Sequence, residues 1–231
     1  MSNVDECERQ PEAAWSGNVE ATATVVEAAR RCGAYVVAMS TDYVFDGATD
    51  RAYTETDAPH PVSVYGRTKW EAEERVKALP GRWAILRTST LYGPARPSFI
   101  DGIIARAARG EAITAFHDQT TSPTYAVDLA GAIAGLIDRL QAPSVPAGIL
   151  HAVNRGWCTR VAFAQYVLSV LGYSPALVTP VALAEQRLPA RRPVMAALAT
   201  QRWSEVFGWA LPTWQDAVRR HLAWHQAHST S

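Results

Sequence analysis

The sequence predicts an α/β fold built from parallel βαβ units. Two short apolar runs that contain β-branched residues, 34–39 and 83–88, are typical of strands buried on both faces of a sheet. Longer segments with helical features lie before and between them, and this alternation favours a parallel sheet. The chain has 231 residues, which is long enough for one domain or for one domain plus a small lobe. Its residues are 48% hydrophobic and 19% charged, which is a globular composition.

Proline, glycine and capping residues mark where the elements begin and end. Pro11 lies where a first helical turn tolerates it, Gly33 lies where a helix stops, and Pro80-Gly81 breaks a second helix. Thr213 and Asp216 form a capping-box pattern that opens a last, amphipathic helix. In chain order, the expected elements are helix 14–32, strand 34–39, loop 46–63, helix 64–79, strand 83–88, helix 99–109, strand 112–116, helix 125–140, strand 148–153, helix 159–171 and helix 213–228.

Charge and cysteine content exclude several classes of function. Lys plus Arg and Asp plus Glu both number 22, so a formal net charge of zero attracts neither nucleic acid nor anionic membranes. No apolar run approaches the ~20 residues that span a bilayer, and the polar start of the chain is no signal peptide. Cys7, Cys32 and Cys158 are too scattered for a disulfide framework or a zinc site. We therefore expect reduced thiols and a cytoplasmic location.

Two further groups of ionisable residues are interpreted as solvated. Acidic residues near the start, among them Asp5, are expected at an exposed helix entry. His221, His225 and His228 share one face of the last helix at a spacing that could bind a metal ion. An exposed terminal helix is the preferred interpretation, so no metal site is expected.

A Tyr-x-x-x-Lys pattern follows a polar strand end. Tyr65 and Lys69 are four residues apart on an expected helix, so they share one face. A lysine ammonium beside a tyrosine lowers the phenol pKa from about 10, and such a phenol can donate a proton to a carbonyl oxygen. Thr41 follows a buried strand, where open α/β sheets bind ligands, and its hydroxyl could hold the same oxygen. The pattern alone could be chance, and the preceding Ser-Thr-Asp strand end strengthens the interpretation.

Short motifs in a fixed order cover most of the chain. They are 4–8, 11–12, Asn18, 40–45, 55–57, Pro61, 64–69, 86–89, 91–93, 118–119, 122–124 and 191–193. In content and order they resemble those of the extended short-chain dehydrogenase/reductases, and within them the dTDP-4-dehydrorhamnose reductase family. The resemblance implies a Rossmann-type, doubly wound parallel sheet with a small C-terminal substrate-binding lobe. It assigns 1–94 and 125–156 to the sheet domain, and 95–124 and 157–231 to the lobe.

The resemblance also implies a reaction, which is hydride transfer from NADPH or NADH to C4 of a nucleotide-linked 4-keto-6-deoxysugar. Tyr65 would protonate the ketone oxygen and Thr41 would polarise it, with Asn18 in support. Lys69 would lower the Tyr65 pKa and hold the nicotinamide ribose. The implied cofactor contacts are Ser40, Tyr65, Lys69, Arg87, Thr88 and Ser89. The implied substrate contacts are Asp42, Val44, Phe45, Gln119 and Arg192.

The chain departs from the family pattern at its start. The family's Gly-x-x-Gly-x-x-Gly turn and first four strands have no counterpart, and neither Gly-x-Gly nor Gly-x-x-Gly occurs among the 14 glycines. Strand 34–39 is then expected to be an open edge that pairs with a second copy or a complementing chain. Because the family's pyrophosphate site is missing, weak or no dinucleotide binding is expected. Thr90 and the residues after Arg192 also differ, which favours a deoxysugar other than rhamnose.

Three functions stay open at this point. The intact set Thr41, Tyr65 and Lys69 favours a reductase. The missing glycine-rich turn favours a non-catalytic sugar-nucleotide-binding or regulatory protein of the same descent. A nucleotide-sugar epimerase or dehydratase would need further acid/base groups near Thr41, and Asp42 is the only obvious one. Fold alone does not choose among them.

Overall fold

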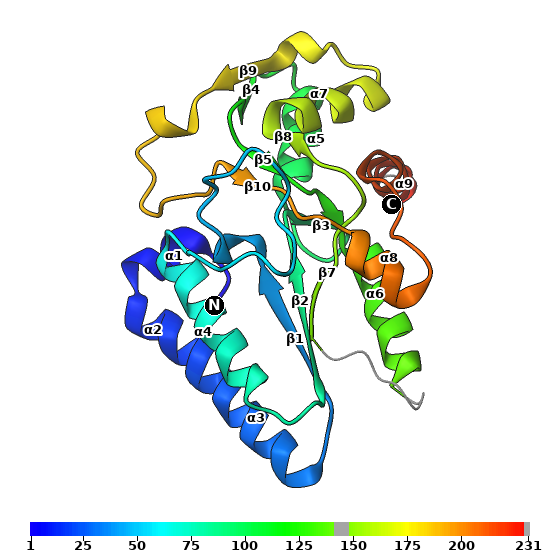
Figure 1. The fold of residues 1–231 in the computed structure, drawn as a ribbon. Coiled ribbons are helices and arrows are strands. Elements are labelled where there is room, and N and C mark those ends of the chain that lie inside the picture. Colours follow the sequence, from blue (N-terminus) through cyan, green and yellow to red (C-terminus); the bar gives the residue numbers. More distant parts are fainter. Residues whose placement is uncertain (141–147, 229–231) are drawn as a thin grey trace.

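The computed structural model describes residues 1–140 and 148–228, and a parallel sheet of three strands lies at its centre. The strands run in the order β1 (Val36–Thr41), β2 (Trp83–Thr88) and β7 (Gly148–His151), as Figure 1 shows. β1 lies two residues later than predicted, and β7 ends two residues earlier. Both strand pairs are parallel, so the predicted α/β fold is confirmed.

Helices from the first part of the chain cover one face of the sheet. They are α1 (Val4–Arg9), α2 (Pro11–Trp15), a π-helical turn (Ser16–Glu20), α3 (Ala21–Cys32) and α4 (Val64–Lys77). The single helix predicted over 14–32 is therefore interrupted by the π-helical turn. The side chains that pack α3 and α4 onto the strands are Ala29, Val36, Val76, Leu79 and Ile85.

A second layer of helices covers the opposite face. α6 (Ala126–Arg139) and α8 (Gln201–Phe207) pack there against β2 and β7. Along β2 the side chains alternate, so that Ile85 faces α3 and α4, whereas Ala84 and Leu86 face α6 and α8. Helices on both faces of a parallel sheet give the doubly wound arrangement that the resemblance implied.

A lobe stands at the carboxyl ends of the sheet strands (Figure 1). It contains α5 (Phe99–Ala108), α7 (Arg160–Leu171) and a parallel pair, β4 (Ile113–Phe116) and β9 (Val178–Val181). These elements share one apolar core with the last helix, α9 (Trp214–His228). The remaining short elements are the 3-10 turns Asp42–Val44, Pro175–Leu177 and Leu183–Glu185, and the strands β3 (Leu91–Tyr92), β5 (Thr120–Thr121), β6 (Thr124–Tyr125), β8 (Cys158–Thr159) and β10 (Met195–Ala196).

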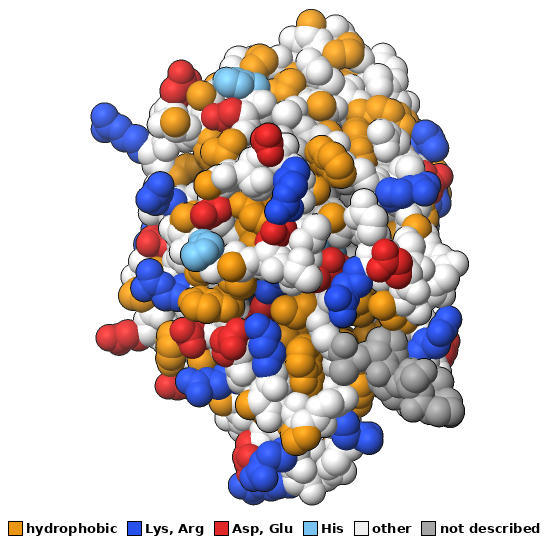
Figure 2. Space-filling view, viewed as in Figure 1, with side chains coloured by type: hydrophobic (Ala, Val, Ile, Leu, Met, Phe, Trp, Pro, Cys, Tyr) orange, Lys and Arg blue, Asp and Glu red, His pale blue; other side chains and the backbone are white. Residues whose placement is uncertain are grey.

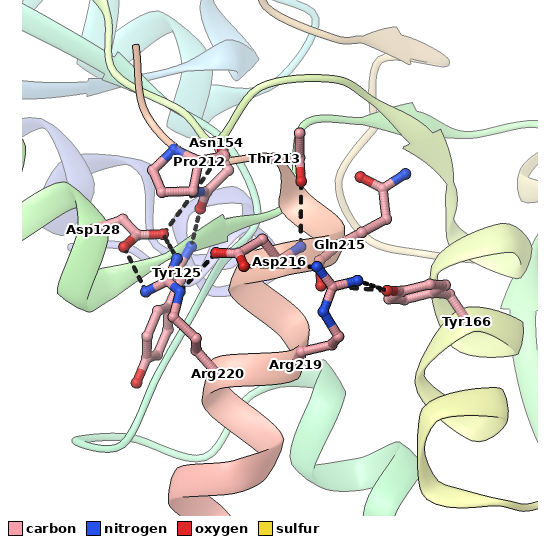
Figure 3. A network of polar contacts seen from close by, with 10 residues as sticks. All are labelled: Tyr125, Asp128, Asn154, Tyr166, Pro212, Thr213, Gln215, Asp216, Arg219 and Arg220. Atoms are coloured by element: carbon pink, nitrogen blue, oxygen red, sulfur yellow. Dashed lines mark hydrogen bonds and ion pairs between the residues drawn. The ribbon is translucent and has the colours of Figure 1, made fainter. Parts of the chain in front are cut away.

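A polar network fastens α9 to the rest of the fold (Figure 3). Arg220 donates hydrogen bonds to both carboxylate oxygens of Asp128 on α6, at 2.8 and 2.7 Å, and to Asp216 on its own helix at 2.7 Å. Asn154 donates to Asp128 at 2.7 Å and accepts from the backbone N–H of Tyr125 at 2.8 Å. The network therefore ties three segments that are distant in the sequence.

Two interpretations of ionisable residues are wrong. Asp5 accepts a hydrogen bond from Arg192 Nη2 at 2.8 Å, so it joins α1 to a late loop instead of lying free in solvent. His221 has no exposed surface. Its ring lies against Tyr92 and Tyr125, with centroid distances of 5.4 and 5.5 Å. His221 is buried because it lies on the apolar face of the amphipathic helix α9, which packs against the lobe core.

The surface agrees with the charge balance. Figure 2 shows basic and acidic side chains interspersed over one face, with apolar side chains between them. This distribution matches the formal net charge of zero. Within the described part of the chain, no helix is long and apolar enough to cross a membrane.

Candidate active site

The predicted polar residues gather where β1 and β2 end. Thr41, the last residue of β1, lies opposite Thr88 in the parallel register. The chain then turns into a 3-10 helix, and the Thr41 hydroxyl caps it by accepting a hydrogen bond from the Tyr43 N–H at 3.2 Å. The carboxyl edge of a parallel sheet is the usual ligand site of such folds, and the hydroxyl is fixed there by the turn.

The helix α4 brings Tyr65 to this edge. Ser63 caps its first turn, since the Ser63 hydroxyl accepts from the Gly66 N–H at 3.2 Å. A Cβ at Gly66 would lie 2.1 Å from the Tyr43 carbonyl oxygen, so only glycine allows the helix to approach this closely. As a result, the Tyr65 phenol hydrogen-bonds with the Thr41 side chain. The structure thus brings two of the three predicted catalytic residues together.

Lys69 is placed differently from the sequence expectation. Its ammonium donates to the Met39 carbonyl oxygen at 2.6 Å, at the edge of β1. Burial lowers the Lys69 pKa, against the opposing charge of Glu73. Burial also raises the pKa of Tyr65 to about 12, and the hydrogen bond with Thr41 only partly opposes this rise. The expected lowering of the Tyr65 pKa is therefore wrong for this structure, because the ammonium is bound to a backbone carbonyl.

Asn18 supports the site through the backbone. It is buried in the π-helical turn, and its Nδ2 donates to the Thr68 hydroxyl at 2.9 Å. Thr68 in turn donates to the Tyr65 carbonyl oxygen at 2.9 Å. π-helical turns often occur at functional sites, and this one aims Asn18 at the turn of α4 that carries Tyr65.

The side chains of Ser40 and Arg87, which were implied as cofactor contacts, are hydrogen-bonded to another residue of the protein. Arg87 donates to both oxygens of Glu73, from Nε at 2.9 Å and from Nη2 at 2.6 Å, and Ser40 donates to the same carboxylate. The side chains of this ion pair are each 1% exposed. Glu73 was missed by the sequence analysis, although it lies four residues after Lys69 on the same helix face. Thr88 is buried too, and its hydroxyl has no hydrogen-bond partner among the described residues.

Three of the implied substrate contacts are also buried. Val44 and Phe45 have no exposed surface, and Phe45 stacks on Tyr53 with a centroid distance of 4.0 Å. These two side chains therefore belong to the core and do not line the site. Asp42 accepts hydrogen bonds from the hydroxyls of Thr41 at 2.9 Å and Ser89 at 2.6 Å. It is 2% exposed, and both of its carboxylate oxygens are bound by neighbouring hydroxyls.

The other two implied substrate contacts meet in one pocket. Gln119 and Arg192 line a cavity of about 160 Å³ together with Tyr43 and Arg160. Arg160 Nε donates to Gln119 Oε1 at 3.4 Å. The pocket adjoins the catalytic edge, because Tyr43 packs edge-on against Tyr65 at 5.7 Å between ring centroids. Guanidinium groups suit an anion such as a diphosphate, although Arg192 is also ion-paired with Asp5 at 2.8 Å.

Arg160 was missed by the sequence analysis. It is the first residue of α7, directly after Thr159, whose hydroxyl caps that helix by accepting from the Ala162 N–H at 3.1 Å. A threonine followed by a helical pattern marks the start of a helix, and the start of a helix can face a ligand. That signal was available, but it does not reveal that α7 begins beside Gln119.

The comparisons with known proteins decide the family. The family model described as "RmlD substrate binding domain" matches residues 1–226. The chain belongs to this family. It is 35% identical over 226 residues to a dTDP-4-dehydrorhamnose reductase of Sinorhizobium fredii, covering 96% of this chain and 76% of that protein. It is 38% identical over 219 residues to a probable dTDP-4,6-dihydroxy-2-methyloxan-3-one 4-ketoreductase of Streptomyces antibioticus, covering 94% and 72%.

Solved structures of the RmlD family support the same assignment. A dTDP-4-dehydrorhamnose reductase of Bacillus anthracis, in complex with NADP, superposes with a TM-score of 0.89 at 30% identity. The match covers 97% of this chain and 78% of that one. The predicted family and the Rossmann-type fold are therefore confirmed.

The open edge of the sheet carries a second hollow. β1 pairs only with β2 in the described sheet, and a groove of about 340 Å³ runs along its other side. Lys69, Val25 and Met39 line it, and the latter two are 58% and 37% exposed. The residues present fit the nicotinamide-ribose end of a dinucleotide beside Lys69. They show no glycine-rich turn for its pyrophosphate.

Proposed function

We propose that this chain carries the proton-transfer and substrate-binding part of an NAD(P)H-dependent reductase. Its substrate would be a nucleotide-linked 4-keto-6-deoxysugar, as the names of its relatives suggest. The observation that carries the proposal is the Tyr65 phenol beside Thr41, next to a pocket with two arginines.

The chemistry follows from the protonation state of Tyr65. With a pKa raised to about 12 by burial, the phenol keeps its proton at neutral pH and can act as an acid. Reduction of a ketone needs such a donor, since negative charge develops on the ketone oxygen. A bound nicotinamide would supply the hydride. Lys69 would hold the cofactor ribose, while Arg160 and Arg192 would hold the diphosphate of the sugar nucleotide.

The open β1 edge is part of the proposal. An apolar parallel strand with one free side pairs readily with another strand. We expect a second copy or a complementing chain to cover the groove beside Met39, and to complete a site for NADPH or NADH. The division into a sheet domain and a lobe, at 94/95, 124/125 and 156/157, and a cytoplasmic location also remain proposals.

A second candidate is a non-catalytic sugar-nucleotide-binding protein. It is favoured by the hydrogen bond from the Lys69 ammonium to the Met39 carbonyl oxygen, which occupies one of the ammonium's three donors. A dehydratase or epimerase is less well supported, because Asp42 is already bound by two hydroxyls and is not free to exchange protons with a substrate.

Calorimetric titration of the folded chain with NADPH, NADH and dTDP tests these candidates. Saturable binding of dTDP and of one nicotinamide, followed by turnover of a dTDP-linked 4-ketosugar, supports the reductase. Binding of dTDP alone supports the non-catalytic candidate. Arg160→Met should weaken dTDP roughly 10-fold or more and leave nicotinamide binding unchanged. Equal dTDP affinity in this variant would remove Arg160 from the substrate site.

A further inference from the structure

Asp42 holds the Thr41 hydroxyl from behind. Its Oδ1 accepts the Thr41 hydroxyl proton at 2.9 Å, and its Oδ2 accepts the Ser89 hydroxyl proton at 2.6 Å. Asp42, Thr41 and Ser89 are only 2, 5 and 2% exposed, so water does not compete for these bonds. The carboxylate is therefore fixed by the ends of two neighbouring strands.

The hydrogen bonds limit what Thr41 can do. A hydroxyl has one proton to donate and two lone pairs to accept with. The Thr41 proton goes to Asp42, and one lone pair accepts the Tyr43 N–H at 3.2 Å. Asp42 and Tyr65 therefore compete for the one Thr41 proton, and the share given to Tyr65 lowers the Tyr65 pKa. While Asp42 is a carboxylate, Thr41 cannot also donate to a ketone oxygen.

We propose that Asp42 is a positioning residue that turns the Thr41 hydroxyl according to its own protonation. As a carboxylate it withdraws the Thr41 proton from the site. As a neutral acid it no longer needs that proton, so Thr41 can donate to the ketone oxygen beside Tyr65. The neutral acid also removes a negative charge from behind an oxygen on which negative charge develops. Reduction is then faster when Asp42 is protonated. This inference rests on the proposed reductase function.

The titration falls in an accessible range. Burial raises the pKa of Asp42 to about 6, against the hydrogen bonds from Ser89 and Thr41 and the charge of Arg160, which lower it. The other ionisable groups that act on this carboxyl are Tyr43 and Tyr65, whose pKa values are raised by burial, and the permanently charged Arg160. Among these groups only Asp42 is expected to titrate near pH 6, and the variant Asp42→Asn tests whether a rate change there belongs to it.

The test is the rate of hydride transfer in single-turnover experiments between pH 5 and 9. In the unaltered chain the rate should rise as pH falls through about 6. Asp42→Asn should lose this dependence, since an amide does not titrate. Thr41→Val should be slower and should keep only the weaker part of the rise, which comes from the charge of Asp42, because no hydroxyl is left to turn. Ser89→Ala should move the rise to higher pH, because the lost hydrogen bond lowered the Asp42 pKa.

A purely structural role for Asp42 would lower the rate and keep the pH dependence. If Asp42→Asn keeps the rise near pH 6, the inference is wrong. Circular dichroism of each variant checks folding.

Infrared difference spectra distinguish failure of the inference about Asp42 from failure of the proposed reductase function. A carboxylic acid band should appear with the Asp42 titration, be absent in Asp42→Asn, and be accompanied by a shift in a Tyr65 ring mode that Tyr65→Phe removes. A chain without turnover that shows the band but no tyrosine shift would overturn the inference on its own.

Discussion

Two buried groups of residues differ in whether their buried polar atoms have hydrogen-bond partners. The polar cluster consists of Ser40, Thr41, Asp42, Glu73, Arg87 and Ser89. The aromatic cage consists of Tyr92, Tyr125, Phe163 and His221. In the polar cluster, each of the two acids accepts at least two hydrogen bonds. In the cage, the Tyr92 hydroxyl and both ring nitrogens of His221 have no hydrogen-bond partner among the described residues.

The difference shows what buried polar atoms are used for in each place. In the polar cluster they orient one another at the sheet edge, and that orientation reaches the Tyr65 phenol through Thr41. In the cage they accompany rings that are needed for packing. The cage is stabilised by ring contacts such as Tyr92 with Phe163, at 5.8 Å, and by Arg220 over the Tyr125 ring at 5.5 Å.

The largest difference in turnover should appear between two variants that each lose one hydroxyl, one at the candidate active site and one in the aromatic cage. Tyr65→Phe should lower turnover on the order of 10³-fold, because it removes the proton donor. The affinity for dTDP should stay unchanged, and the free energy of unfolding should fall by no more than about 1 kcal/mol, as expected for one lost hydrogen bond. Tyr92→Phe is the matched control and should keep full turnover. Comparable losses in both variants would mean that Tyr65 acts through packing.

Breaking the buried ion pair should give the next largest effect. Arg87→Met leaves the Glu73 carboxylate buried without its guanidinium partner, which should lower the free energy of unfolding by about 3–5 kcal/mol. Replacing both, with Arg87→Met and Glu73→Leu, should recover a large part of this loss. Urea denaturation measures both variants. A double variant no more stable than Arg87→Met alone would show that the charge is not the cause.

Acid should separate the cage from the polar cluster. Burial lowers the His221 pKa from its usual 6.5, so below that pH the unfolded chain binds a proton that the folded chain does not. Stability from neutral His221 is therefore present above about pH 6.5 and lost as pH falls, by up to about 1.4 kcal/mol per pH unit. His151 behaves alike, because burial lowers its pKa to about 3.

The variant His221→Phe isolates the contribution of His221 to the loss of unfolding free energy in acid. The free energy of unfolding of this variant, followed by urea denaturation from pH 7 to 5, should fall less steeply than that of the unaltered chain. The acid loss due to His151 should remain in both. Parallel curves for the two proteins would contradict the assignment to His221.

The smallest effect concerns the unpartnered hydroxyl of the cage. Tyr92→Phe removes a buried polar atom without a hydrogen bond, so it should raise the free energy of unfolding by about 1 kcal/mol. Removing a hydroxyl that has partners should do the reverse, and Ser89→Ala is the comparison in the polar cluster. Thermal denaturation of both would show opposite signs, and a shared sign would erase the distinction.

The sequence was sufficient for the fold and for the meeting of Thr41 with Tyr65. Short apolar strands between helices specify a parallel sheet, and the carboxyl end of β1 and the capped start of α4 then converge. Strand bounds were displaced by two residues, since Ser40 and Thr41 are polar yet paired with β2. The π-helical turn was missed, because it arises from a local shift in backbone hydrogen bonding.

What the sequence could not show was which polar partner each side chain takes. Lys69 could face Tyr65 or the sheet edge, and only the position of the Met39 carbonyl decides this. Arg87 was assigned to a ligand, whereas its guanidinium is bound to the buried Glu73 carboxylate. Val44 and Phe45 stood in a functional motif, yet their apolar side chains fill the core beneath it.

The bond between Asp5 and Arg192 links residues that are 187 positions apart. Synthesis proceeds at about 5–20 residues per second, so Arg192 is added roughly 10–40 s after Asp5. During that time β1 and β2 can form, while the carboxylate of Asp5 is still hydrated. The contact between the first helix and the late loop is thus among the last to form on the ribosome, and the cavity that Arg192 lines is completed only at that stage.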